Sequence, residues 1–116
     1  MAREFDNERF NCPLDAALQA IGGKWKGIIL FHLSIKKMRF NQLNKSIPKV
    51  TERMLIRQLR ELEKDELVLR TVYPVVPPKV EYEITEFGKT LIPVLTELNG
   101  WGKTYINKLT KLRSVA

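Results

Sequence analysis

The sequence predicts an α+β fold that is mostly α-helical and forms a single domain. Apolar residues recur at helical spacing over most of the chain, and two short strand-like runs follow one another between residues 67 and 84. A chain of 116 residues, 44% hydrophobic and 28% charged, is long enough for one hydrophobic core. We therefore expect an N-terminal arm over residues 1–10 and one domain over residues 11–112.

Two helices are expected at the start of this domain. Pro13 suits a first helical turn because its missing N–H would be unpaired there in any case, and Gly22–Gly23 should end that helix. A second helix is expected to begin near Lys24. Its bulky residues nearly surround it, which predicts the central buried element of the fold.

Two more helices should follow, joined by a tight turn. The third is short and is broken before Pro48, since a residue that precedes proline avoids the helical region. Thr51 is a favourable N-cap for a fourth helix that runs to about Lys64. A short helix, a turn and a longer amphipathic helix are the order of a helix-turn-helix, here at about residues 39–64.

A β-hairpin and a last helix complete the predicted elements. Leu67–Tyr73 is rich in β-branched and apolar residues, and Val80–Ile84 alternates strictly between apolar and polar residues. Prolines between these runs exclude a continuous ladder, so the hairpin should carry an extended tip. Thr85 is expected to cap a helix over about residues 86–112. A hairpin placed after a helix-turn-helix is a wing, so we expect a winged helix-turn-helix with additional N- and C-terminal helices.

Four cationic side chains form one row on the predicted fourth helix. At about 100° per residue they fall within about 60° of one another, opposite three leucines that would dock on the core. The row is Arg53, Arg57, Arg60 and Lys64, and the leucines are Leu55, Leu59 and Leu62. A solvated helix face is the alternative, but such faces usually mix charges of both signs. A row of one sign favours contact with the major groove of double-stranded DNA, which accepts one helix.

The distribution of charge extends this predicted surface. The net charge is +7, and the stretch from Ala16 to Thr51 contains no acidic residue. Because all charged side chains in this stretch are positive, it should attract polyanions. Besides the row, the candidate DNA-binding residues are Arg39, Lys45, Thr51, Arg70 and Lys79. Arg39 and Lys45 are placed on the third helix and Lys79 at the tip of the wing. Lys79 could equally be a solvated loop lysine.

The sequence resembles the HxlR family of winged-helix regulators. The resemblance covers about residues 11–106 and rests on several segments: Cys12–Leu14, Ile21–Lys26, Arg39–Leu43, Met54–Leu55, Gln58–Glu63, Arg70–Pro74, Val76–Tyr82 and Leu95–Gly102. It implies a dimeric regulator whose first and last helices form the dimer interface and whose third and fourth helices and wing bind DNA. Two positions depart from the family pattern, because Glu66 stands where glycine is usual and Val75 where an acidic residue is frequent.

The apolar stripe on the last helix exceeds what the core of a small domain needs. A homodimer interface is therefore expected, with a simple core helix as the alternative. The residues assigned to this interface are Leu14, Leu18, Leu91, Val94, Leu98, Trp101, Tyr105 and Leu109. A two-fold symmetric dimer would read a pseudo-palindromic operator.

Cys12 is the only thiol. The resemblance implies a cysteine that in some members responds to electrophiles or oxidants, whereas a small residue packed at the dimer interface is the alternative. No metal site, cofactor or catalytic residue is predicted, since His32 is the lone histidine and lacks partners at ligand spacing. A polar N-terminus and the lack of a long apolar run predict a cytoplasmic, nucleoid-associated protein with no membrane contact. A winged helix used for protein–protein interaction is the alternative function. The resemblance is also compatible with regulation by a small-molecule effector, whose identity the sequence does not give.

Overall fold

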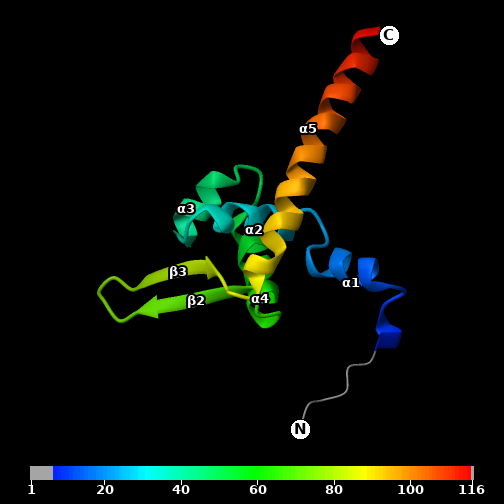
Figure 1. Cartoon of the computed structure of the whole chain (residues 1–116). Coiled ribbons are helices and arrows are strands. Elements are labelled where there is room, and N and C mark those ends of the chain that lie inside the picture. The colour runs from blue at the N-terminus through cyan, green and yellow to red at the C-terminus, as the bar shows by residue number, and fades with distance from the viewer. Residues whose placement is uncertain (1–6, 116) are drawn as a thin grey trace.

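The computed structural model describes residues 7–115, so the first six residues of the predicted arm lie outside the described part. It confirms the α+β, mostly helical winged helix-turn-helix fold (Figure 1). After a 3-10 turn at Asn7–Arg9, the elements are α1 Pro13–Ala20, α2 Lys26–Ile35, β1 Met38–Arg39, α3 Phe40–Ser46, α4 Glu52–Lys64, β2 Val68–Tyr73, β3 Lys79–Ile84, a 3-10 turn at Gly88–Leu91 and α5 Ile92–Val115.

Helix α2 contributes three fully buried side chains, Ile29, Leu30 and Leu33, to the core. It begins at Lys26, two residues later than expected, because Gly23 adopts a left-handed conformation with φ of 70° and the turn continues after it. The prediction that this helix is the central buried element is confirmed, although not every bulky residue on it is covered. Ile28 is 39% exposed, so one face of this helix is left open to solvent.

Helix α4 has the bounds that the sequence predicts. The Thr51 hydroxyl accepts a hydrogen bond from the Met54 N–H at 3.2 Å, which satisfies one of the unpaired donors of the first turn. Leu55, Leu59 and Leu62 are buried and fix the inner face of the helix on the core.

The sheet has three strands in the order β1-β3-β2, all antiparallel. Strands β2 and β3 form the predicted hairpin, with Val68 opposite Ile84 and Tyr73 opposite Lys79. Strand β1 was not predicted; its two residues pair with β3, and Arg39 lies opposite Glu81. Arg39 is therefore a strand residue that precedes α3, and its predicted place on the helix was wrong.

The C-terminus of α4 is closed by paired backbone hydrogen bonds. The Leu67 N–H donates to the Leu62 carbonyl at 2.9 Å, and the Glu66 N–H donates to the Glu63 carbonyl at 3.0 Å. This is the Schellman arrangement, in which the residue after the C-cap takes a left-handed conformation. Glu66 occupies that position with φ of 60°, where glycine would carry no steric penalty.

The segment after the hairpin does not start a long helix at once. The Thr85 hydroxyl accepts from the Gly88 N–H at 2.8 Å, but the turn that it caps is the 3-10 helix, and α5 begins only at Ile92. The predicted start at residue 86 was wrong for this reason. Gly88 is packed so closely that a Cβ would overlap the Leu67 carbonyl oxygen and lie 2.7 Å from Ile84 Cγ1.

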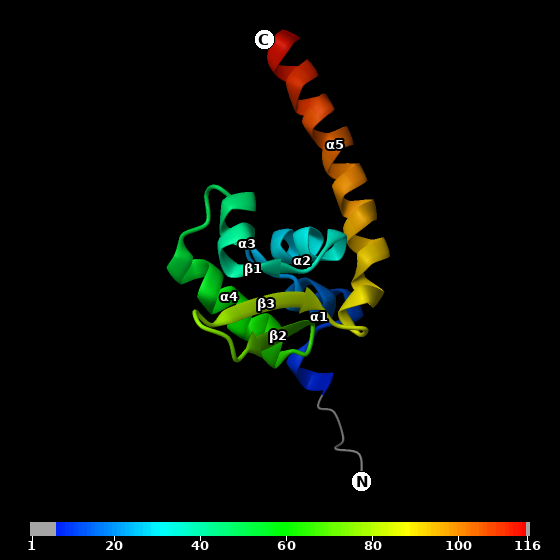
Figure 2. The same cartoon turned by 90° about the vertical axis from the view of Figure 1, so that its left-hand side faces the viewer.

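Helix α5 projects beyond the rest of the molecule in both views (Figures 1 and 2). Its first turn packs on the core through the buried Leu95 and the half-buried Ile92, and the half-buried Leu91 of the preceding 3-10 turn packs there too. Figure 2 shows α3 and α4 on one side of the molecule and α5 on the other. Among the helices at residues 7–115, none combines the length and the apolar character needed to span a bilayer.

Candidate nucleic-acid interface

The four cationic residues of the predicted row are all exposed on the outer face of α4. Arg53, Arg57, Arg60 and Lys64 lie on the side of the helix away from the buried leucines. Thr51 is exposed as well, and its hydroxyl is engaged in capping the helix. The structure thus brings these residues together as one basic ridge, open to a partner along the whole length of α4.

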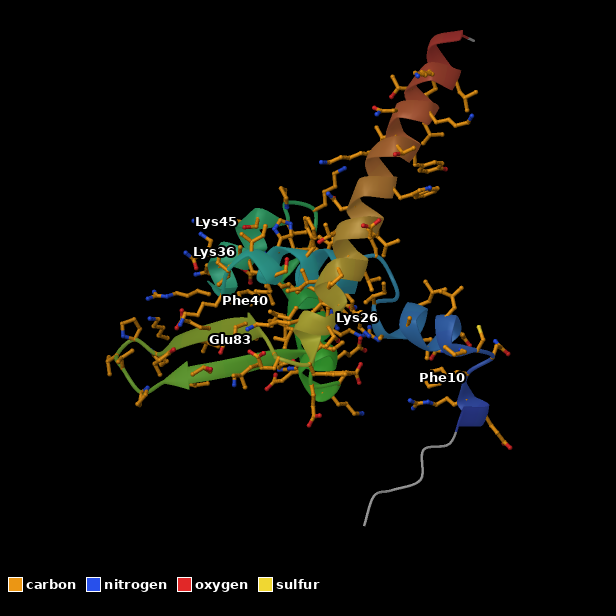
Figure 3. The ribbon with its side chains drawn as sticks, viewed as in Figure 1. Phe10, Lys26, Lys36, Phe40, Lys45 and Glu83 are labelled. Atoms are coloured by element: carbon orange, nitrogen blue, oxygen red, sulfur yellow. The ribbon has the colours of Figure 1, made fainter. Side chains whose placement is uncertain are left out.

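The hairpin and α4 converge on a common groove. A hollow of about 480 Å³ lies between them and contains one arginine from each side, Arg60 of α4 and Arg70 of β2. The acidic residue Glu63 and the apolar or aromatic residues Phe40, Ile56, Val80 and Tyr82 also line it, and Figure 3 shows Phe40 between α3 and β3. Because two cations and one carboxylate border the hollow, an anionic group seated there could contact both arginines, with the charge of Glu63 opposing it.

Lys79 does not lie at the tip of the hairpin as predicted. It is the first residue of β3, and the tip is formed by residues 74–78, where Val76 is 100% exposed. The Lys79 Nζ atom lies 3.6 Å from a Glu81 carboxylate oxygen and 4.8 Å from the centre of the Tyr73 ring. A hydrogen bond from the Tyr73 hydroxyl, more than the charge of Lys79, lowers the pKa of Glu81. Lys79 would therefore have to exchange partners to contact DNA.

Basic residues near α3 add to the same side of the molecule. Arg39 and Lys45 are exposed, and Figure 3 shows Lys36 and Lys45 pointing outward beside α3, on the side from which the hairpin projects. Lys36 and its exposed neighbour Lys37 were not assigned to the site from sequence. The signal that could have found them is their place in the stretch that lacks acidic residues.

Lys26 belongs to that stretch but faces inward. Its Nζ atom lies 3.0 Å from a Glu61 carboxylate oxygen of α4, and the Lys26 side chain is mostly buried. The hydrogen bond from Lys26, followed by its charge, lowers the pKa of the Glu61 carboxyl. This ion pair joins the start of α2 to the flank of α4, so the Lys26 charge is paired within the fold.

The residues assigned to the dimer interface fall into two groups. Leu91 and Leu109 are half-buried, and Leu91 packs on the core. The others are exposed on α1 and α5: Leu14, Leu18, Val94, Leu98, Trp101 and Tyr105. Trp101 is 62% exposed and stacks on Tyr105 with ring centres 5.2 Å apart. A core helix accounts only for the first turns of α5, because the apolar stripe continues well beyond the body of the domain.

Cys12 is exposed at the N-terminus of α1, where it precedes Pro13. Its carbonyl accepts a hydrogen bond from the Ala16 N–H at 3.2 Å, so the backbone of the residue is part of the helix start. The thiol is therefore held on an ordered element and is open to reagents in solvent.

Comparison with known proteins gives one consistent result. The sequence model of the HxlR-like helix-turn-helix family matches residues 20–110. The HTH-type transcriptional regulator YdeP of Bacillus subtilis (strain 168) is 53% identical over 103 residues, covering 89% of this chain and 80% of the relative. The solved structure of the redox regulator HypR in its reduced form superposes with a TM-score of 0.82 at 48% identity, covering 86% of this chain and 99% of HypR. A crystal structure of the regulator ytcD superposes with a TM-score of 0.78 at 48% identity, over 83% and 98% of the two chains.

Proposed function

Because the chain belongs to the HxlR-like helix-turn-helix family of transcriptional regulators, we propose that it binds double-stranded DNA sequence-specifically as a homodimer. In this proposal α4 is the recognition helix, which enters the major groove, and the β2–β3 hairpin is the wing. The basic ridge of α4 is the observation that carries the proposal. Its four exposed cationic side chains, on a helix whose other face is packed on the core, are complementary in charge to the phosphates of DNA.

The surrounding cations supply the contacts that hold DNA in register. Arg39, which precedes α3, and Lys45, which lies on α3, would contact phosphates, and Arg60 with Arg70 would hold a phosphate in the groove between α4 and the wing. Phosphate contacts carry no sequence information, whereas arginine can bond guanine through two hydrogen bonds. We assign base contact to Arg53 and Arg57, which lie nearest to the N-terminus of the recognition helix.

The dimer proposal rests on the exposed apolar stripe of α5 and the leucines of α1. Leu14 is 66% exposed and Trp101 is 62% exposed. Several large apolar side chains exposed on one helix face indicate an interaction site, and a second copy of the chain presents the same stripe. In the symmetric dimer two recognition helices would lie about 34–36 Å apart and would read two half-sites.

Regulation through Cys12 is the third part of the proposal. A redox regulator, HypR, is among the similar structures, and the thiol of Cys12 is exposed. Treatment with diamide should change the affinity for DNA in the wild-type protein and leave a Cys12→Ser variant unchanged. An equal response in both proteins would remove Cys12 from this role.

The central experiment measures DNA binding as a function of salt. A duplex selected by the protein from a random library should bind the wild type much more tightly than random duplex DNA. Arg57→Ala should weaken binding to the selected duplex severely, and Lys45→Ala should reduce the slope of log K against log salt by about one per protomer, or about two for the dimer. Retained affinity for the selected duplex in Arg57→Ala, together with an unchanged slope in Lys45→Ala, would refute the proposed interface.

A further inference from the structure

A large apolar side chain stands exposed next to the basic ridge. Met54 lies on the outer surface of α4 with 41% of its surface accessible to solvent. It sits about 60° around the helix from Arg57, three residues on, so the two side chains are neighbours on one face. A single exposed methionine needs no explanation on an ordinary surface, but this one borders the cations that define the proposed DNA contact.

The position of Met54 is fixed by the start of the helix. It is the third residue of α4, and its N–H is bound by the Thr51 hydroxyl. The first turn of a recognition helix is the part that faces base edges. The thioether is therefore held at the N-terminal end of the ridge, and its backbone donor is already satisfied.

Double-stranded DNA offers one apolar group in the major groove, the 5-methyl group of thymine. We propose that Met54 packs against a thymine methyl group in each half-site and so determines part of the operator sequence. This inference rests on the proposed function, since it requires α4 to lie in the major groove. Arg53 and Arg57 supply the attraction for the polyanion, and the flexible, polarisable methionine side chain supplies an apolar contact.

Ile56 is the comparable side chain on the other flank of the ridge. It is 39% exposed, but it lines the groove between α4 and the wing together with Phe40 and Val80. Its apolar surroundings thus come from its own chain. Ile56 therefore serves as the matched control, because it has the same exposure on the same helix and a different neighbourhood.

The test uses deoxyuridine, which keeps the pairing of thymine and removes only its methyl group. A duplex selected by the protein from a random library is synthesised with each thymine replaced in turn, and its dissociation constant is measured at one fixed salt concentration. For the wild type we expect about a fourfold loss of affinity at one thymine per half-site, the ratio for exposing one methyl-sized group. Met54→Ala should bind the thymine duplex more weakly and lose nothing further with deoxyuridine at that position.

The control variants make the outcome decisive. Ile56→Ala should keep the wild-type penalty at that position, and Met54→Gln, which preserves length and helical propensity, should lose it as Met54→Ala does. The proposal is overturned if no deoxyuridine position affects the wild type, if Met54→Ala keeps the full penalty, or if Ile56→Ala loses it instead. Failure of the library to yield any preferred sequence would overturn the proposed function itself, and with it this inference.

Discussion

Replacing Glu66 with glycine should make the protein more stable. Glu66 has φ of 60° just after the end of α4, in the Schellman arrangement that glycine usually occupies. The Glu66 N–H donates to the Glu63 carbonyl, and the Glu66 carbonyl accepts from the Thr85 hydroxyl. Neither bond involves the Glu66 side chain. The substitution therefore removes steric strain and leaves the hydrogen bonds of the turn in place.

The magnitude follows from two opposing effects. A left-handed conformation costs an L-residue about 1–2 kcal/mol, which glycine does not incur. Glycine also makes the unfolded chain more flexible, which offsets about 0.4–1 kcal/mol of that gain. Loss of a carboxylate at a helix C-terminus adds a few tenths of a kcal/mol to the gain. We expect a net stabilisation of about 1 kcal/mol, which for 116 residues corresponds to a rise in Tm of about 4 °C.

Two control variants separate the backbone effect from the charge effect. Glu66→Ala removes the carboxylate but keeps the Cβ atom, so it should change stability by only a few tenths of a kcal/mol. Asp65→Gly removes an equal charge at the preceding residue, where φ is −82°, and should destabilise the protein. Thermal and urea unfolding at one matched protein concentration give the comparison, since dimerisation would make Tm depend on concentration.

The reasoning is refuted if Glu66→Gly is no more stable than Glu66→Ala. That result would mean that the left-handed position carries no strain, or that its strain is relieved in a way that glycine does not improve. A rise in Tm for Asp65→Gly equal to that for Glu66→Gly would show that charge, and not backbone conformation, is the cause.

Three further predictions address packing, assembly and pH. Gly88→Ala should destabilise the protein by about 1–3 kcal/mol in urea unfolding because its Cβ has no room, whereas Gly100→Ala, with open space around it, should be neutral or stabilising. Trp101→Ala should weaken self-association by about 2 kcal/mol, close to thirtyfold in sedimentation equilibrium, if the stripe of α5 is the dimer interface; an unchanged constant contradicts that assignment. The pKa of the Glu81 carboxyl is lowered in the folded protein, mainly by the hydrogen bond from Tyr73. The stability that this carboxylate contributes is therefore present above its pKa in the unfolded chain and is lost as pH falls through the lowered folded value. Tyr73→Phe should have a lower urea midpoint than the wild type at neutral pH, and the two midpoints should approach each other only in acid.

Helix α4 could be predicted from sequence because its signals are local and agree with one another. A cap at Thr51, leucines at steps of three and four, and a charged opposite face all specify the same helix in the same register. The outward direction of the basic row follows from the docking of Leu55, Leu59 and Leu62, so the central feature of the candidate site could also be predicted. The strained end at Glu66 was visible in the sequence as a departure from the family pattern.

The elements that sequence could not predict depend on partners far along the chain. Strand β1 has two residues and exists because Met38 and Arg39 pair with β3, more than 40 residues later, and so short a segment has no periodicity of its own. The delayed start of α5 arises from the packing of Gly88 against the carbonyl of Leu67. The pairing of Lys26 with Glu61 is likewise a tertiary contact, so a count of cations overstates how many face a partner.

One residue, Thr85, forms hydrogen bonds to segments next to both helix α4 and the proposed dimer helix α5. The Thr85 hydroxyl donates to the Glu66 carbonyl at 2.6 Å and accepts from the Gly88 N–H at 2.8 Å, while the Thr85 N–H donates to the Leu67 carbonyl at 3.1 Å. The end of α4, the base of the wing and the turn that leads into α5 therefore meet at Thr85. In the proposed dimer, a change in the angle of α5 would reach the recognition helix through this junction, with no flexible linker to absorb it. The spacing of the two half-sites is then a property of the packing around Thr85 and Gly88 as much as of the interface itself.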